Sequence, residues 1–166
     1  SSSFAACPRS SLSAGPCFVD ANVFVYARDP RDPRKQERAA QWIDVLWRDR
    51  VGRTSTQAIS EFYAVVTKKL GFPAERAWQY AERYFAWRPL AIDEALLRRA
   101  REIEQRYRLS WWDSMIVAAA QLQECAVLLT EDLQDGVAFG SVTVRSPFTL
   151  EIREAPATYT ATPLAV

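Results

Sequence analysis

The feature that most restricts the fold of this chain is the alternation of short apolar runs with segments in which apolar residues recur every three or four positions. The short runs, which have the length of strands, lie at 17–19, 51–55, 89–92, 125–130 and 141–145. Strands that alternate with helices form a mostly parallel sheet with helices on both faces. The sequence therefore predicts an α/β fold with three layers, α/β/α, around one central sheet.

Helical spacing and end signals predict the helices between these runs. Helices are expected over 33–50, 56–70, 73–88, 94–108 and 112–123, with one or two further turns over 21–27. Asp32 before Pro33 is typical of an N-cap followed by proline at the first helical position, and Asp93 is expected to cap the helix that follows it. Gly71 is a helix stop signal. The segment 112–123 is apolar nearly all round, which indicates a helix buried on several sides.

Length and composition indicate a single domain. The chain has 166 residues, of which 49% are apolar, enough to bury one sizeable core. We expect a loose leader over 1–15, a folded domain over 16–148 and a peripheral tail over 149–166. The leader lacks the continuous apolar stretch of a signal peptide, and no apolar run has the length of a membrane span, so no membrane association is expected.

The chain contains no histidine, and this excludes a large part of enzyme chemistry. A Ser-His-Asp triad, a Cys-His pair and a zinc site built on histidine are all ruled out. The three cysteines, Cys7, Cys17 and Cys125, are far apart and include no C-x-x-C pair, which argues against a disulfide framework and favours a reducing cytoplasm. Proton transfer and metal binding must therefore fall to carboxylates, lysine, tyrosine or cysteine.

The formal net charge of +1 does not by itself indicate a nucleic-acid partner. Only Lys35, Lys68 and Lys69 among the 21 basic residues are lysine. Arginine suits phosphate contacts, but a GC-rich genome explains the same bias equally well.

Two acids stand at the ends of predicted strands: Asp20 directly after the run 17–19, and Asp132 two positions after the end of the run 125–130. In open α/β sheets, ligands bind beyond the carboxyl ends of the strands, where such acids lie. Each acid taken alone has an ordinary alternative role as the cap of the next turn. The position of both acids indicates a candidate site without proving one.

Two further acids lie on predicted helices. Asp113 stands at the start of the buried helix 112–123, where a charge is unusual unless the helix end faces a polar pocket, although Ser110 and Asp113 also have the spacing of a capping box. Glu61 lies at the flank of the apolar stripe of its helix, and most helical glutamates are simply solvated. If Asp20, Glu61, Asp113 and Asp132 converge, they would repel one another unless a cation neutralises them, and all-oxygen ligands favour Mg²⁺ or Mn²⁺.

Four segments of the chain resemble the motifs of PIN-domain nucleases, in the family's order. They are FVDANVFVYA at 18–27, STQAISEFY at 55–63, LSWWDSMIVAAA at 109–120 and LLTEDLQDG at 128–136. Together they cover roughly residues 17–148. Within that family, the size and the motif wording are most similar to VapC-type toxins of bacterial toxin–antitoxin pairs.

The resemblance implies a PIN-like fold and a function. Asp20, Glu61, Asp113 and Asp132 would line one pocket that holds Mg²⁺ or Mn²⁺, with Asp20 and Asp113 as the closest ligands. Asn22 and Ser55 match polar positions that would orient the carboxylates. The activity implied is an endoribonuclease of the type II toxin class, in which a water activated by the metal attacks RNA and leaves a 5′-phosphate and a 3′-hydroxyl. A cognate antitoxin, a homodimer and a cytoplasmic location are implied as well.

The residues argue against two other functions. A catalytically inactive PIN-like module that binds RNA or protein would have no reason to keep four acids that repel one another. A phosphatase of the haloacid-dehalogenase type or a receiver domain would need a functional lysine near a later strand, and no lysine follows Lys69.

Overall fold

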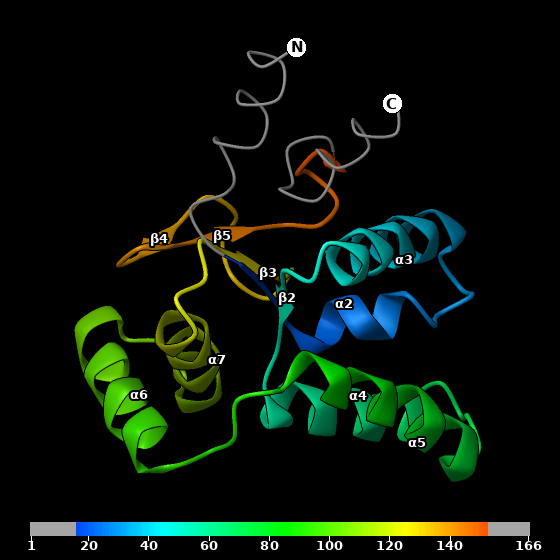
Figure 1. Cartoon of the computed structure of the whole chain (residues 1–166), viewed down its shortest axis with the longest axis horizontal. Helices are drawn as coiled ribbons and strands as arrows, with labels where there is room; N and C mark the ends of the chain where they lie inside the picture. The colour runs from blue at the N-terminus through cyan, green and yellow to red at the C-terminus, as the bar shows by residue number, and fades with distance from the viewer. Residues whose placement is uncertain (1–15, 153–166) are drawn as a thin grey trace.

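The computed structural model describes residues 16–152 and contains a five-stranded sheet in the order β2-β1-β3-β5-β4 (Figure 1). Its strands are β1 (Cys17–Val19), β2 (Gly52–Arg53), β3 (Val127–Leu129), β4 (Ala138–Phe139) and β5 (Val142–Arg145). The first four in sheet order are parallel, and β4 pairs antiparallel with β5 at one edge. The predicted mostly parallel sheet is confirmed. The expected leader and residues 153–166 of the expected tail lie outside the described residues.

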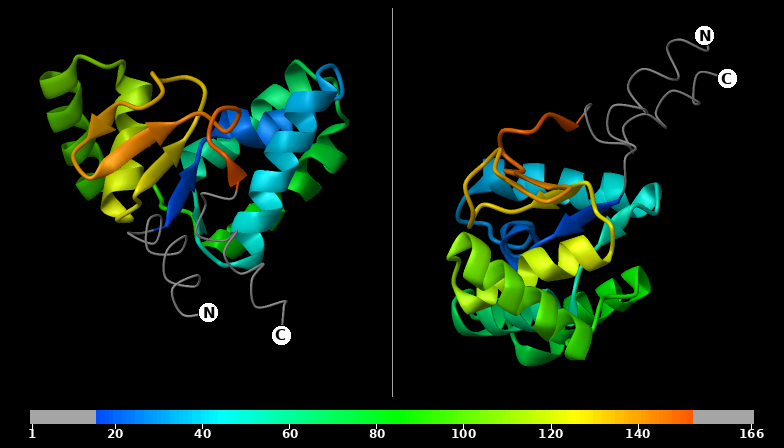
Figure 2. Two further views of the ribbon diagram at one scale, coloured as in Figure 1. Left: turned by 90° about the horizontal axis from the view of Figure 1, so that it is seen from above. Right: turned by 90° about the vertical axis from the view of Figure 1, so that its left-hand side faces the viewer.

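Helices cover both faces of this sheet. They are α2 (Ala21–Tyr26), α3 (Pro33–Arg48), α4 (Thr56–Lys68), α5 (Ala74–Arg83), α6 (Glu94–Tyr107) and α7 (Trp111–Leu122), with a 3-10 helix η1 (Tyr84–Trp87) after α5. Seen from above, the sheet lies between α6 and α7 on one side and the remaining helices on the other (Figure 2). The predicted three-layer α/β/α architecture is therefore present. No helix among the described residues is long and apolar enough to cross a membrane.

Side-chain caps explain where four of these helices begin. Asp32, Ser55, Asp93 and Ser110 each accept a hydrogen bond from the backbone N–H three residues further on. A side-chain oxygen at this position satisfies a backbone donor that has no partner within the helix. The caps expected at Asp32, Asp93 and Ser110 are thus found in the structure.

The segment between α5 and α6 differs from the prediction. The expected helix 73–88 is α-helical only to Arg83 and continues as η1, after which Arg88 adopts a left-handed conformation with φ of 50°. Pro89 explains this end, because a proline disfavours α-helical geometry in the residue before it. The expected strand 89–92 is wrong in extent, since only Leu90 pairs, in a single bridge with Ser55. The edge strand β4 was not expected.

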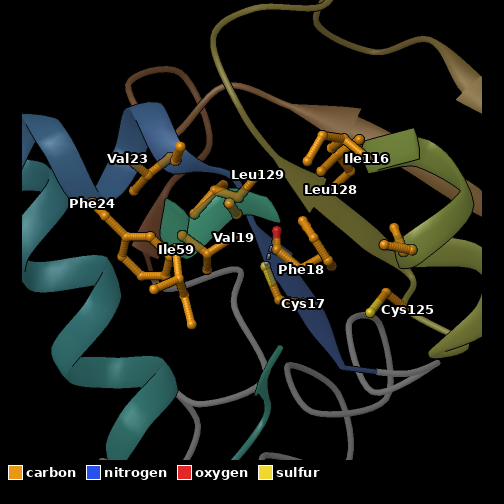
Figure 3. Packing of buried hydrophobic residues seen from close by; sticks show 14 of the residues in the cluster. Cys17, Phe18, Val19, Val23, Phe24, Ile59, Ile116, Cys125, Leu128 and Leu129 are labelled. Carbon is orange, nitrogen blue, oxygen red and sulfur yellow. Dashed lines mark hydrogen bonds between the residues drawn. The ribbon is translucent and has the colours of Figure 1, made fainter. Parts of the chain in front are cut away.

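The centre of the core lies where the sheet meets the helices on both faces (Figure 3). Phe18, Val19, Leu128 and Leu129 on the two central strands are fully buried. Parallel strands covered on both faces are expected to be apolar throughout, as these are. The same central strands end at the acids, so the core fixes the backbone on which the candidate site is built.

Candidate metal centre and active site

Asp20 lies at the carboxyl end of β1 and is the N-cap of α2. Only 5% of the residue is exposed. Its Oδ1 accepts a hydrogen bond from Ala21 N at 2.7 Å, and its Oδ2 accepts from Thr130 Oγ1 at 2.9 Å. Its backbone N–H donates to Leu129 O at 3.1 Å, which continues the pairing of β1 with β3. Both carboxylate oxygens of Asp20 are therefore held in fixed directions.

The electrostatic surroundings of Asp20 favour its neutral form. Burial raises the pKa of this carboxyl from 3.8 to about 7, against the hydrogen bonds from Ala21 and Thr130, which lower it. The carboxylates of Asp132 and Glu61 raise the pKa further by repulsion. Asp132 and Glu61, from distant parts of the sequence, thus lie within electrostatic reach of Asp20.

Thr130 connects three of the polar groups at this site, and sequence reasoning did not single it out. It follows β3 directly and is fully buried. Besides donating to Asp20, its Oγ1 accepts from Asn22 Nδ2 at 2.8 Å and from Asp132 N at 3.1 Å. The available signal was its position between a strand and an acid. Thr130 holds Asp20, Asn22 and the backbone of Asp132 together.

Asn22 contacts both sides of the site from the first turn of α2. Its Nδ2 lies 3.5 Å from Asp20 Oδ2, and its Oδ1 accepts from Glu131 N at 3.2 Å. The amide therefore spans the gap between the ends of β1 and β3. This is a geometry in which it can orient a carboxylate.

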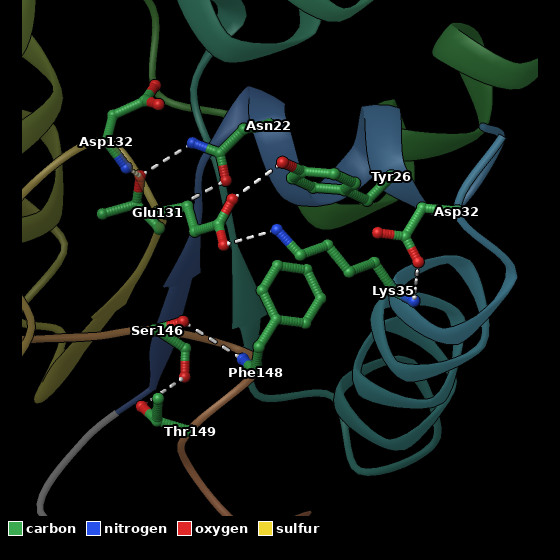
Figure 4. Close-up of polar contacts among 10 residues, drawn as sticks. Asn22, Tyr26, Asp32, Lys35, Glu131, Asp132, Ser146, Phe148 and Thr149 are labelled. Atoms are coloured by element: carbon green, nitrogen blue, oxygen red, sulfur yellow. Dashed lines mark hydrogen bonds and ion pairs between the residues drawn. The ribbon is translucent and has the colours of Figure 1, made fainter.

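The loop that carries Asp132 is tied to α2 and α3 through Glu131 (Figure 4). Tyr26 donates from its hydroxyl to Glu131 Oε1 at 2.8 Å, and Lys35 Nζ donates to Glu131 Oε2 at 3.0 Å. The Lys35 ammonium also lies 4.9 Å from the ring centroid of Tyr26 and 4.8 Å from that of Phe148. Asp132 itself is exposed, so its carboxylate faces solvent while the backbone beside it is held.

Glu61 and Asp113 lie on neighbouring helix ends that Gln57 connects. The Gln57 amide donates from Nε2 to Glu61 Oε1 at 2.9 Å and to Trp112 O at 3.3 Å. Asp113 is half-buried in the first turn of α7, and its N–H donates to Ser110 Oγ at 3.1 Å. Its carboxylate is not among the groups that shift the pKa of Asp20. The sequence analysis did not identify Gln57 as a residue of the site.

The predicted site residues therefore differ in how closely the structure connects them to Asp20. Glu61 and Asp132 both act electrostatically on Asp20. Asp113 directly follows Trp112, whose carbonyl oxygen accepts from the same Gln57 amide that donates to Glu61. Ser55 is buried as the cap of α4, where its Oγ accepts from Ala58 N at 3.2 Å, and within residues 16–152 it has no hydrogen bond to an acid. Its expected role in orienting the carboxylates stays a prediction.

The donor set suits a hard divalent cation. Within the described part of the chain, no group of three or more His, Cys, Asp or Glu side chains is gathered closely enough to hold a metal ion. Mg²⁺ does not need such a cage, because it usually keeps several waters and binds through one or two carboxylates. Buried Asp20 together with the exposed carboxylates of Asp132 and Glu61 offers oxygen ligands of this kind.

A sheet of parallel strands that delivers acids to its carboxyl edge places them where open α/β sheets bind their ligands. The sequence profile of the PIN domain matches residues 17–134, more than half of the chain, and the chain belongs to the PIN domain family. This confirms the resemblance drawn from the four motifs.

The fold is also similar to a solved structure, that of VapC20 from Mycobacterium tuberculosis, a toxin described as cleaving the sarcin-ricin loop. The TM-score is 0.54 at 18% sequence identity, over 68% of this chain and 86% of that one. At this identity, the similarity concerns the fold alone. No curated protein sequence is significantly similar to this chain.

Proposed function

We propose that this protein is a Mg²⁺- or Mn²⁺-dependent endoribonuclease. The observation that carries the proposal is the buried carboxyl of Asp20, whose pKa is raised to about 7 by burial and by the neighbouring acids Asp132 and Glu61. A buried acid amid other acids lowers the stability of the metal-free fold, and such groups occur most often at functional sites. Membership of the PIN domain family supports the same conclusion.

The roles proposed for the acids follow from the PIN-domain motifs that they match. Asp20 and Asp113 would be the closest ligands, with Asp132 and Glu61 completing the set directly or through water. A bound cation supplies positive charge that keeps these carboxylates ionised, and Lewis acidity toward a phosphate oxygen and water. Thr130 and Asn22 hold Asp20 in its orientation, while Glu131, through Lys35 and Tyr26, holds the loop of Asp132.

We further propose that the nuclease acts in the cytoplasm as the toxin of a type II pair, as a homodimer with a cognate antitoxin. Trp78 and Phe85 support a partner surface on α5 and η1, since each is 46% exposed and their ring centroids lie 5.8 Å apart. Tyr63 on α4 extends this surface, with its ring 5.9 Å from that of Trp78. Exposed apolar patches of this kind mark protein interfaces. A purified chain that stays monomeric at high concentration would contradict the dimer.

The test compares the wild-type protein with Asp20→Asn and Asp113→Asn on total RNA, with Mg²⁺ or with EDTA. We expect cleavage that needs the metal and is lost in both variants, with products that carry 5′-phosphates. Circular dichroism of each variant checks that it remains folded. RNA binding without cleavage by the wild-type protein would favour the inactive binding module instead. Equal cleavage by the variants would defeat the assignment of the site.

A further inference from the structure

An open groove lies beside Glu61, between the first turns of α4 and α7. It has a volume of about 710 Å³ and is lined by Thr56, Gln57, Ser60, Glu61, Ile92 and Trp112. Two large apolar side chains and several short polar ones thus share one hollow with a candidate metal ligand. This combination of apolar walls and a few polar groups is typical of a ligand site.

Trp112 is the most unusual residue of this groove. It is 62% exposed, more than any other large apolar side chain in the described part of the chain. Its backbone is nevertheless fixed, because Ser110 caps the helix turn that contains it and Gln57 donates to its carbonyl oxygen. The indole therefore projects into solvent from a rigid support. Ile92, 47% exposed, lines the same groove.

The position of the groove identifies the chemistry of its occupant. Glu61 lines it, so both apolar side chains adjoin one of the acids proposed to bind the metal at the phosphodiester. An RNA phosphate held at these acids carries a nucleoside on each side. Exposed aromatic faces stack nucleobases, and short polar side chains such as Ser60 and Thr56 provide partners for the base edge.

We propose that Trp112 stacks a nucleobase of the RNA next to the scissile phosphate, with Ile92 as a second apolar wall of that subsite. This inference rests on the proposed ribonuclease function and adds a residue that positions the substrate and contributes to base preference. No ion is needed for the stacking. The subsite can therefore be tested separately from the metal and from cleavage.

The first test measures RNA binding without cleavage. The probes are a labelled single-stranded RNA of mixed sequence and the same ribose-phosphate backbone without bases, and the protein carries Asp20→Asn to prevent cleavage. Adding Trp112→Ala should weaken binding of the RNA about 5- to 150-fold, the range of one stacked base, and leave binding of the abasic strand unchanged. Trp112→Phe should retain most of the affinity. Leu97→Ala, which removes an exposed apolar side chain from α6, is the matched control and should change neither.

The second test places the base relative to the cleaved bond. In an RNA that the wild-type protein cleaves, the nucleosides on either side of the cleaved bond are made abasic one at a time. At one of the two positions, the losses from the abasic change and from Trp112→Ala should not add, because both remove the same contact.

Three results would overturn the inference. One is equal RNA binding with and without the indole, and another is full additivity at both abasic positions. The third is a change in sedimentation of Trp112→Ala from dimer to monomer that accounts for the lost binding, since the groove would then be an interface between copies of this chain. A wild-type protein that binds RNA through Trp112 but never cleaves it would refute the proposed function and leave the stacking intact.

Discussion

At the scale of single residues, the account depends on why a carboxyl group is buried at the end of β1. Asp20 caps α2 and receives a hydrogen bond from Thr130, yet these contacts do not offset its burial, and its pKa is raised to about 7. A residue that served only as a helix cap would normally keep its carboxylate in solvent. The burial of Asp20 is therefore better explained by a charged ligand than by the fold.

The raised pKa of Asp20 predicts how the stability of the metal-free protein depends on pH. The folded state holds a proton on this carboxyl up to about pH 7, whereas the unfolded chain releases it near the ordinary value of 3.8. The folded state thus binds more protons between these values, so stability falls as the pH rises and is lowest above pH 7. Asp20→Asn should remove this dependence and raise the melting temperature at pH 8 in EDTA by roughly 4 °C or more.

Thermal unfolding in EDTA at pH 5.5 and pH 8 measures the effect in both proteins. Excess Mg²⁺ should reverse the order at pH 8, because only the wild-type protein gains stability from the ion. Parallel pH dependence in the two proteins would show that Asp20 is not the group responsible.

The second residue-scale prediction concerns Thr130. Thr130→Val keeps the shape of the side chain but removes the hydroxyl that donates to Asp20, so the pKa of Asp20 should rise further. Metal binding requires the deprotonated carboxyl, and cleavage should therefore fall about 10- to 100-fold, with its pH profile shifted to higher pH. Thr130→Ser, which keeps the hydroxyl, should retain the wild-type profile. A uniform loss of activity without a shift would indicate a purely structural role.

At the scale of elements, most of the fold follows from local sequence, and the errors have local causes. Helix starts were predictable because Asp32, Asp93 and Ser110 are capping residues at the right spacing. The range 89–92 was expected to be a strand from its apolar residues alone, but only Leu90 meets a partner. Strand pairing depends on a distant segment, and a short apolar run contains no information about whether one is present.

The contact between β2 and η1 gives a prediction at this scale. A Cβ added at Gly52 would lie 2.6 Å from Trp87 Cη2, and this indole is buried against Phe24, Trp47 and Tyr84. Gly52→Ala should therefore destabilise the protein by about 1–3 kcal/mol, as overpacking does. In the double variant Gly52→Ala/Trp87→Phe, the smaller ring should restore part of the lost stability. Denaturant unfolding of both variants measures this difference. A stable Gly52→Ala protein would show that the indole moves easily.

At the scale of the whole molecule, the convergence of the four acids could not be derived from the residues alone. That expectation depended on the resemblance to PIN-domain nucleases. Asp20 and Asp132 follow neighbouring strands, β1 and β3, and their proximity could be predicted from the rule for parallel sheets. Glu61 and Asp113 lie on different helices, and their relation depends on how α4 and α7 meet the sheet. The position of Thr130 between a strand and an acid is visible in the sequence. Its hydrogen bond to Asp20, and that of Gln57 to Trp112, are not, since these partners lie far along the chain.

The most direct test of the account is a Mn²⁺ titration followed by electron paramagnetic resonance, for the wild-type protein, Asp20→Asn, Asp132→Asn and the surface control Glu102→Gln. If the acids at the carboxyl edge share a cation, Asp20→Asn and Asp132→Asn should each weaken Mn²⁺ binding at least tenfold, and Glu102→Gln should bind as the wild type does. Equal Mn²⁺ affinity in all four proteins would contradict a shared metal centre.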